Sequence, residues 1–340
     1  MATAARPLHG HSWPGRLPRV PDEAWTREPL DPLGTRYNAL DAHGWYRNLD
    51  PTVAQVVALL DDDDIMVDYS GGTGILTRRV LAASRARLGV VIVDSSSKFL
   101  RVAIEELAAD ERAAFRLLPY VRDEGRLRTL DEVLDPELVA YGVDVLTSTN
   151  AVHLYTDLPA TLLGWRRSLR RGAAVLISSA NIRNPHARPG EWILDETVAA
   201  INEIAAEVVA REPLFARHRA GLEDAARMAA HRAHRERIFV PVRPLDLYTD
   251  TLEAEGFSVL SVFGMTIQAR VSEWYPLLET YHDGVLGWVG GNERIDGEAP
   301  TAEAVEDRLF LIRYALERLF RGEDSFDCCW TYITGRSRGA

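Results

Sequence analysis

A glycine-rich loop between an apolar strand and a helix limits most strongly how this chain can fold. Residues 67–74 read VDYSGGTG and connect the apolar run Ile65–Tyr69 to a helical stretch at 74–84. Glycine adopts φ values that a Cβ resists, and its bare backbone allows a ligand to approach closely. The free N–H groups at the start of the helix bind polar ligand atoms. The sequence therefore predicts a ligand-binding strand–loop–helix unit, a pattern that dinucleotide enzymes also use.

Apolar strands and helices then alternate through the first half of the chain. The expected strands are 65–69, 89–93, 115–121, 143–148 and 173–179, and the expected helices are 74–84, 99–109, 127–138 and 159–169. Alternation of this kind is typical of an α/β fold with a parallel, doubly wound sheet covered by helices.

The rhythm breaks after residue 179. Helices are expected at 190–236, 245–255 and 272–322, and strands at 257–269 and 327–334. We divide the chain into an N-terminal arm and helical lid (1–60), a Rossmann-like core (61–184), a helical cap insertion (185–244) and a C-terminal part of the core (245–340) that holds a second helical insertion at about 270–325. We expect the two insertions to enclose a small-molecule pocket and exclude water from it.

Composition excludes several classes of protein. The 340 residues carry a net charge of −11, which disfavours a nucleic-acid partner because phosphate binding needs a basic surface. We expect no membrane partner, because no run of 18 apolar residues exists. The Pro- and Arg-rich start does not read as a signal peptide, so a cytoplasmic protein is expected. Lys98 is the only lysine, which suggests GC-rich bacterial coding.

A carboxylate in the right place indicates an adenosine-containing cofactor. Asp94 ends the second strand twenty residues after Gly74, where a carboxylate accepts both hydroxyls of a ribose. This spacing suits NAD and S-adenosylmethionine (SAM) alike. The third glycine of the dinucleotide fingerprint is replaced by Thr77, and Asp68 would repel a pyrophosphate. Asp68 also suits the positively charged amino group of SAM, so SAM is favoured.

Residues 67–74 resemble motif I of the class I, Rossmann-like SAM-dependent methyltransferases of the small-molecule type, an acidic residue followed by spaced glycines. The resemblance covers about residues 60–182 and 245–335. It implies a seven-stranded sheet whose last strand is antiparallel between the fifth and sixth, with SAM as cofactor and S-adenosylhomocysteine as product. Ser70 departs from the pattern, because it stands where the family's glycine run begins.

The resemblance also implies a set of cofactor contacts. They come from the loop, the tip of the second strand, the segment after the third strand and the fourth-strand motif: Asp68, Ser70, Gly71, Gly72, Gly74, Asp94, Ser95, Arg122, Asp123 and Asn150. Arg122 and Asp123 correspond to the family's adenine contacts. Tyr37 and Tyr46 belong to the region that folds over SAM in similar enzymes, and a place in the hydrophobic core is the alternative for both.

Candidates for catalysis and substrate binding follow the fourth and fifth strands. His153 is the candidate general base because imidazole titrates near neutral pH, and Tyr155 is a weaker one; each has pocket lining as its alternative. Glu191, Trp192 and Asp195 suggest an aromatic, acidic mouth that would suit an amine, although acids also favour helix N-termini. The second insertion adds Tyr281, His282 and Trp288, as pocket wall or core.

A group of histidines and an apolar repeat are interpreted as structural features. His218, His231 and His234 are surrounded by arginines, so we expect a solvated basic face and no metal. The apolar repeat at 309–320 is typical of a core helix or of a homodimer interface.

The leading hypothesis is a methyltransferase of bacterial specialised metabolism that acts on a small molecule, with an amine or amino-acid nitrogen favoured. The alternatives are an oxygen or carbon acceptor, a SAM-binding enzyme without methyl transfer, and an NAD(P)-dependent oxidoreductase.

Overall fold

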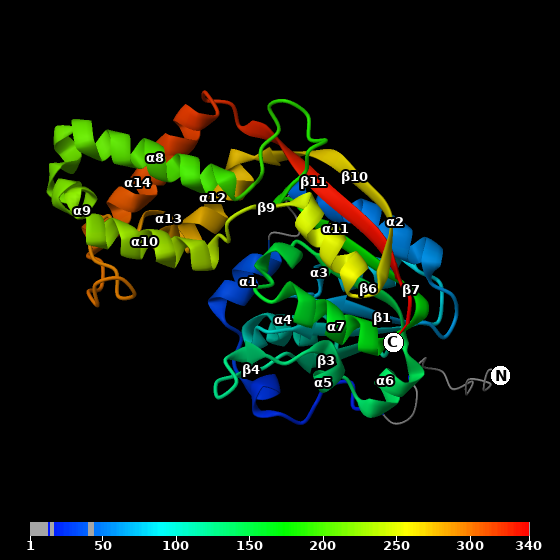
Figure 1. Ribbon diagram of the computed structural model, residues 1–340. Helices are drawn as coiled ribbons and strands as arrows, with labels where there is room; N and C mark the ends of the chain where they lie inside the picture. Colours follow the sequence, from blue (N-terminus) through cyan, green and yellow to red (C-terminus); the bar gives the residue numbers. More distant parts are fainter. Residues whose placement is uncertain (1–12, 14–16, 40–43, 340) are drawn as a thin grey trace.

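The computed structural model describes Trp13, residues 17–39 and residues 44–339. Of the predicted arm and lid (1–60), residues 1–12, 14–16 and 40–43 lie outside the described residues. Figure 1 shows an α/β body with a group of helices extending from one side of it.

Seven strands form the central sheet, in the order β10-β11-β7-β6-β1-β2-β3. Their bounds are β1 Ile65–Tyr69, β2 Gly89–Asp94, β3 Ala113–Leu117, β6 Val143–Thr149, β7 Leu169–Ser179, β10 Phe257–Arg270 and β11 Ser325–Ser337. The pairs β1–β2, β1–β6, β2–β3 and β6–β7 are parallel. Strand β11 pairs antiparallel with both β7 and β10. The predicted doubly wound sheet with an antiparallel last strand is confirmed.

Helices cover both faces of this sheet, which explains why its inner strands read as continuous apolar runs. Successive side chains point to opposite faces, so Met66 belongs to one core while Ile65 and Val67 belong to the other. The first core is closed by α2 Asp50–Leu59, α3 Ile75–Ala83 and α4 Ser97–Leu107. The second is closed by α5 Leu130–Val133, α6 Pro136–Tyr141, α7 Leu158–Ser168 and α11 Leu245–Ala254.

The segment after the third strand differs from the prediction. Strand β3 ends at Leu117, and a separate hairpin follows, formed by β4 Tyr120–Val121 and β5 Arg126–Leu127. The single helix expected at 127–138 is two short helices, α5 and α6. They separate because Asp135 precedes Pro136 and adopts extended backbone angles, as the proline ring requires of its neighbour.

The two insertions form one helical unit, visible in Figure 1 as the helices beside the sheet. Helix α8 packs on α14, and α10 packs on α13. The elements are α8 Glu196–Arg211, η5 Pro213–His218, α9 Arg219–Glu223, α10 Ala225–Ile238, α12 Val271–Thr280, α13 His282–Leu286 and α14 Ala302–Leu319. Within α14, Leu311, Ile312 and Leu316 are buried, which places one face of the repeat at 309–320 in the core of the helical unit.

The histidines of the helical unit are not on a solvated face, which corrects the prediction. His218, His231 and His234 are all buried. Nε2 of His218 lies 2.6 Å from Oδ2 of Asp307. Nε2 of His231 lies 3.2 Å from Oδ1 of Asn202, and Nε2 of His234 lies 3.5 Å from Oδ2 of Asp283. Packing between the helices buries the three rings. No cluster of three metal-ligating side chains exists among the described residues.

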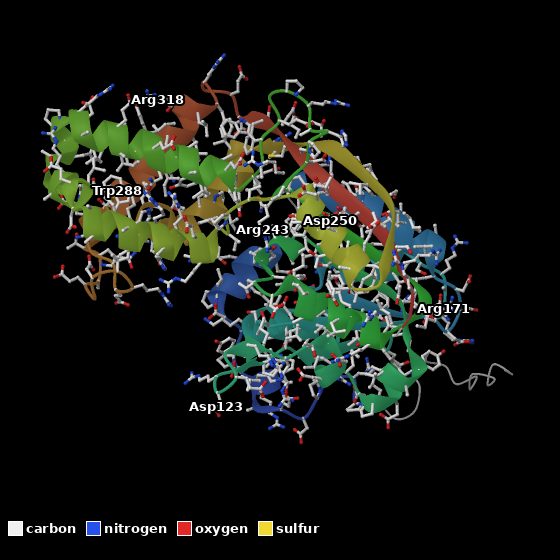
Figure 2. The ribbon with its side chains drawn as sticks, viewed as in Figure 1. Asp123, Arg171, Arg243, Asp250, Trp288 and Arg318 are labelled. Carbon is white, nitrogen blue, oxygen red and sulfur yellow. The ribbon has the colours of Figure 1, made fainter. Side chains whose placement is uncertain are left out.

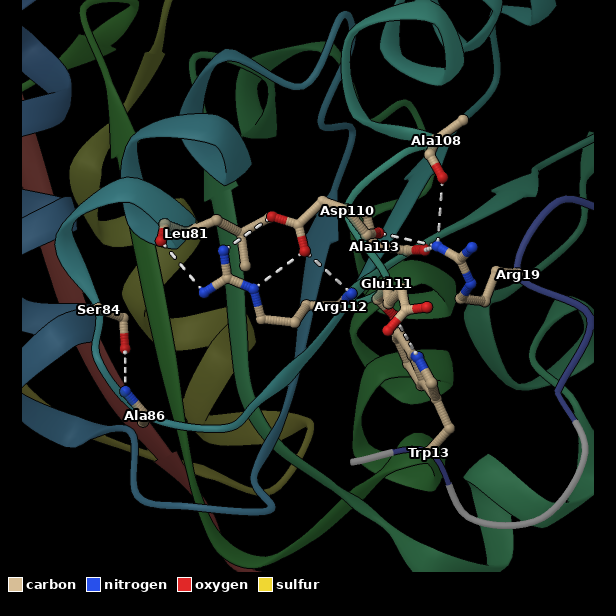
Figure 3. Close-up of polar contacts among 10 residues, drawn as sticks. All are labelled: Trp13, Arg19, Leu81, Ser84, Ala86, Ala108, Asp110, Glu111, Arg112 and Ala113. Carbon is tan, nitrogen blue, oxygen red and sulfur yellow. Dashed lines mark hydrogen bonds and ion pairs between the residues drawn. The ribbon is translucent and has the colours of Figure 1, made fainter. Parts of the chain in front are cut away.

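Trp13 and Arg19 of the N-terminal segment lie beside the edge strand β3 and the turn before it (Figure 3). The Arg19 guanidinium donates to the carbonyl oxygen of Asp110 at 2.8 Å, and the Trp13 indole donates to that of Glu111 at 2.9 Å. The carbonyl of Arg19 accepts from the N–H of Phe115 in β3 at 2.9 Å. This contact occupies backbone groups that an exposed sheet edge would otherwise present.

Short elements complete the chain: η1 Ala24–Arg27, α1 Pro32–Ala39, η3 Gly44–Leu49, η4 Val152–Leu154, β8 Ile182–Arg183 and β9 Arg243–Pro244. Within the part of the chain that the structure describes, no helix has both the length and the apolar character needed to cross a bilayer.

Candidate active site

The glycine loop packs directly onto the carboxyl ends of β1 and β2. The N–H of Gly71 donates to Val93 in β2 at 3.1 Å. A Cβ added to Gly71 would lie 2.8 Å from Cγ of Asp68 and 2.9 Å from Cγ2 of Ile92, closer than real Cβ contacts come. Gly74 is the N-cap residue of α3 with a φ of 80°, and a Cβ added to it would lie 3.0 Å from Cδ1 of Leu107. Contact with the sheet, as well as ligand approach, therefore requires glycine here.

Asp68 is fully buried beneath this loop. Its Oδ2 accepts from the Thr77 hydroxyl at 2.7 Å, and its Oδ1 accepts from the Thr147 hydroxyl at 3.2 Å. Burial raises the pKa of Asp68 to about 6 despite these bonds. Asp68 holds the loop from below and is not among the residues that line the two cavities described next, so its contact with the amino group of SAM stays a prediction.

Asp94 lies at the tip of β2 with its carboxylate held by two backbone groups. Oδ2 accepts from the N–H of Gly72 at 2.9 Å, and Oδ1 accepts from the N–H of Ser96 at 2.8 Å. Burial raises its pKa above the usual value. The two backbone bonds fix the orientation of the carboxylate toward the cavity that it lines, and each oxygen keeps a lone pair for a ligand hydroxyl.

A cavity of about 590 Å³ opens beside Asp94 and the loop. Five further predicted cofactor residues line its wall: Tyr37, Ser70, Gly72, Ser95 and Asn150. Tyr155, which was predicted as a catalytic residue, lines it as well. Tyr37 stacks at a tilt against Phe99, with ring centroids 5.1 Å apart. Tyr46 is buried next to the cavity that adjoins this one.

Arg122 and Asp123 do not line this cavity. They lie at the exposed turn of the β4–β5 hairpin, where Figure 2 shows Asp123 pointing outward. The hairpin instead presents Tyr120 and Leu127 to the cavity. Neither side chain is among the predicted cofactor contacts, because the third strand was expected to continue to residue 121. The turn residues 122–125 were the signal that could have indicated a hairpin.

Tyr155 anchors the loop at Ser70. Its hydroxyl donates to Oγ of Ser70 at 3.0 Å and lies 2.8 Å from Oγ of Ser148. Burial raises the pKa of Tyr155 well above its usual value, so the phenol stays protonated at neutral pH. This arrangement supports a positioning role for Tyr155.

Ser70 offers a test of this anchor, because its φ of 59° is strained for serine. We expect Ser70→Gly to change the free energy of unfolding by less than about 1 kcal/mol, since relief of roughly 1 kcal/mol of strain offsets a hydrogen bond of similar worth. Ser70→Ala keeps the strain, loses the bond and should be less stable by about 1 kcal/mol. Urea unfolding of both variants measures this difference, and equal stability of the two would contradict it.

A second cavity of about 610 Å³ adjoins the first, and Tyr37, Asn150, Leu154 and Thr156 line both. Its floor is formed by the ends of β6 and β7, and its cover by the end of α10 and by α12. Six aromatic residues contribute to its wall: Tyr37, Tyr46, Phe239, Trp274, Tyr281 and Trp330. Asn150 is fixed between the two cavities, donating to Asn48 at 3.0 Å and accepting from the Trp330 indole at 2.7 Å.

His153 lines the second cavity but is held in a hydrogen-bond chain. Its Nδ1 lies 3.0 Å from Oγ of Ser179, and the amide nitrogen of Asn181 lies 3.2 Å from its Nε2. The Asn181 oxygen accepts from the N–H of Asp195 at 2.8 Å, which turns the amide nitrogen toward the imidazole. Burial, then the positive charge of Arg243, lower the pKa of His153 to about 3. Neither ring nitrogen of this neutral imidazole is free to take a substrate proton.

Of the predicted substrate residues, Asp195 and Tyr281 line the second cavity. Glu191 and Trp192 do not, because their segment turns back onto the last strand, where the N–H of Trp192 donates to Asp327 at 2.8 Å. Glu191 accepts from the Thr266 hydroxyl there.

His282 and Trp288 also lie away from this cavity. His282 lies beside Arg308, with 3.4 Å between the ring and the guanidinium. The Trp288 indole is buried inside the helical unit and donates to Asn202 at 2.9 Å (Figure 2).

No protein-family model matches the sequence, and no curated protein matches it. Solved structures resemble the chain at low sequence identity. The YcgJ protein from Bacillus subtilis is 13% identical, with 87% of this chain and 100% of that chain covered and a TM-score of 0.49. Phosphoethanolamine N-methyltransferase 2 from Haemonchus contortus is 15% identical, with 89% of this chain and 56% of that chain covered and a TM-score of 0.48. That structure is a complex with phosphomonomethylethanolamine and S-adenosylhomocysteine.

A geranyl diphosphate methyltransferase in complex with SAM is 14% identical, with 93% of this chain and 95% of that chain covered and a TM-score of 0.43. The fold itself is established by the strand order of this chain, in which β11 enters antiparallel between β7 and β10. The chain thus has the class I, Rossmann-like fold of the SAM-dependent methyltransferases.

Proposed function

We propose that this chain is a SAM-dependent methyltransferase that methylates a nitrogen atom of a small molecule in bacterial specialised metabolism. The observation that carries this proposal is the pair of adjoining cavities at the carboxyl edge of the sheet, which share Asn150 and Tyr37 as a common wall. Open α/β sheets bind their ligands at this edge.

The first cavity fits the methyl donor. Asp94 presents a fixed carboxylate for ribose hydroxyls, and the hairpin contributes Tyr120 and Leu127 as an apolar wall for a purine ring. The loop around Gly72 leaves the backbone open, with nothing within 4 Å of the position that a Cβ would take. These residues would hold SAM, which supplies a methyl group on a positively charged sulfur when it is bound.

The second cavity fits a small acceptor with an apolar body and a basic nitrogen. A volume of about 610 Å³ lies in the range of small-molecule sites. Its aromatic wall favours a cation as well as an apolar body, and Asp195 adds a carboxylate. The cover from α10 and α12 makes a site for a macromolecular substrate less suitable.

Three indole compounds of similar shape test this proposal: tryptamine, tryptophol and indole-3-propionic acid. With SAM labelled in its methyl group, we expect label in tryptamine and none in the alcohol or the acid. Calorimetry should detect binding of S-adenosylhomocysteine. Transfer to tryptophol alone would overturn the preference for nitrogen. Binding of NADH without binding of S-adenosylhomocysteine would overturn the proposal and favour an oxidoreductase.

A further inference from the structure

We infer that Asp195 is the general base that takes the proton from the acceptor nitrogen, an inference that rests on the proposed function. Asp195 lies between β7 and α8, and the N–H of Leu194 donates to Ala180 at 3.3 Å, which holds the segment against the end of β7. The side chain lines the second cavity together with Asn150 and Tyr281. It is therefore a carboxylate placed where the acceptor would bind.

Stabilisation of the helix terminus does not account for this carboxylate. Asp195 occupies the N-cap position of α8, yet its side chain accepts no hydrogen bond from the backbone of that helix. Asp224 shows the contrast at the start of α10, because its carboxylate accepts from the N–H groups of Ala226 and Arg227 at 2.9 and 3.0 Å. The alternative interpretation was that the acidic residues at 191–196 stabilise the N-terminus of a helix. At Asp195 the hydrogen bonds that this interpretation requires are not formed.

The hydrogen-bond chain from His153 positions Asp195. Ser179 holds Nδ1 of His153, and Nε2 of His153 holds the side-chain amide nitrogen of Asn181. The side-chain oxygen of Asn181 accepts from the backbone N–H of Asp195. His153, the residue first considered as the base, thereby becomes a positioning residue with both ring nitrogens occupied.

The surroundings of Asp195 suit a base that works near neutral pH. Burial raises its pKa to about 7, partly opposed by a hydrogen bond from Asn181. The titratable and charged side chains that face the same cavity are Tyr37, Tyr46, His153, Glu236, Arg237 and Tyr281. His153 is neutral above its pKa of about 3, and burial raises the pKa of Tyr37 and of Tyr281 above their usual values. A catalytic pKa close to the working pH is the optimum for proton transfer.

The proposed step is balanced. The Asp195 carboxylate accepts a proton from the substrate ammonium group, and the nitrogen keeps the electron pair of that N–H bond. This lone pair forms the new bond to the methyl carbon as the carbon–sulfur bond breaks, and the electron pair of the broken bond remains on sulfur. The product leaves as a methylammonium ion and S-adenosylhomocysteine, and Asp195 returns its proton to water.

The test compares Asp195→Asn with the neighbouring control Glu196→Gln, whose carboxylate pairs with Arg183 outside the cavity. In the native protein, kcat/KM for tryptamine should rise tenfold per pH unit below about pH 7 and then level, because the carboxylate must be ionised. Asp195→Asn should lower kcat by about 100-fold at pH 8 and abolish this rise. Glu196→Gln should keep the native kcat at pH 8 and the pH-dependent rise of kcat/KM.

Two measurements keep the outcomes separate. Binding of S-adenosylhomocysteine to Asp195→Asn should match the native protein within about threefold, which shows an intact fold and donor site. Carbon-13 NMR of labelled aspartate should show one carboxyl that titrates near pH 7 in the native protein and is missing from the variant. Retention of the pH-dependent rise in Asp195→Asn, or a change in KM alone, would overturn the role of Asp195 as base. Failure of the native protein to bind S-adenosylhomocysteine would instead overturn the proposed function.

Discussion

Replacement of Asp94 by alanine is expected to weaken binding of S-adenosylhomocysteine by about 100-fold or more. The Asp94 carboxylate is fixed by the N–H groups of Gly72 and Ser96, so its remaining lone pairs are oriented before the ligand arrives. Two hydrogen bonds from ribose hydroxyls to a charged acceptor contribute roughly 1.5–3 kcal/mol each, and 1.4 kcal/mol corresponds to a tenfold change in affinity. Calorimetry of the purified variant measures the loss.

Asp123→Ala is the matched control for this change. The resemblance in sequence places Asp123 at the adenine, whereas the structure places it at the exposed turn of the hairpin. We expect the control to bind S-adenosylhomocysteine as the native protein does. A loss of affinity in Asp123→Ala as large as that in Asp94→Ala would show that the hairpin closes on the ligand in a different arrangement.

Gly71→Ala is expected to abolish measurable binding of S-adenosylhomocysteine and to lower the free energy of unfolding by about 1–3 kcal/mol, the usual cost of overpacking. The added methyl group would lie 2.8 Å from Cγ of Asp68 and 2.9 Å from Ile92. Asp68 cannot move aside easily, because it is fully buried and bonded to two threonine hydroxyls. The loop must therefore rise into the cavity that the donor would occupy.

Gly335→Ala provides the control, since its added Cβ would meet only the carbonyl oxygen of Ser258, at an ordinary distance of 3.4 Å. Calorimetry and urea unfolding of both variants give the comparison. Normal binding by Gly71→Ala would mean that the loop does not pack against Asp68 as the structure shows.

The contact between Asp68 and Thr77 explains why a threonine occupies the position of the third glycine. The absence of a third glycine at Thr77 argued against a dinucleotide, and the structure supplies a positive reason for threonine, whose hydroxyl donates to the buried Asp68. The sequence could not show this bond, because a residue's burial depends on what packs around it. The same limit explains the hairpin at 120–127, where an exposed turn and a strand end are hard to separate by residue pattern alone.

The amino-acid sequence by itself determined the strand–loop–helix unit around residues 65–94 and the alternating pattern of strands and helices. These two features are local, or follow from the period of apolar residues, so they can be recognised without knowledge of distant contacts. The antiparallel direction of the last strand was expected only from the resemblance to the methyltransferase family. The tertiary structure alone decided which polar residues share a cavity. Ser179 and Asn181 are 26 and 28 residues from His153, yet they occupy both of its ring nitrogens. Burial raises the pKa of Asp195 to about 7, since burial disfavours the charged form of a carboxyl group.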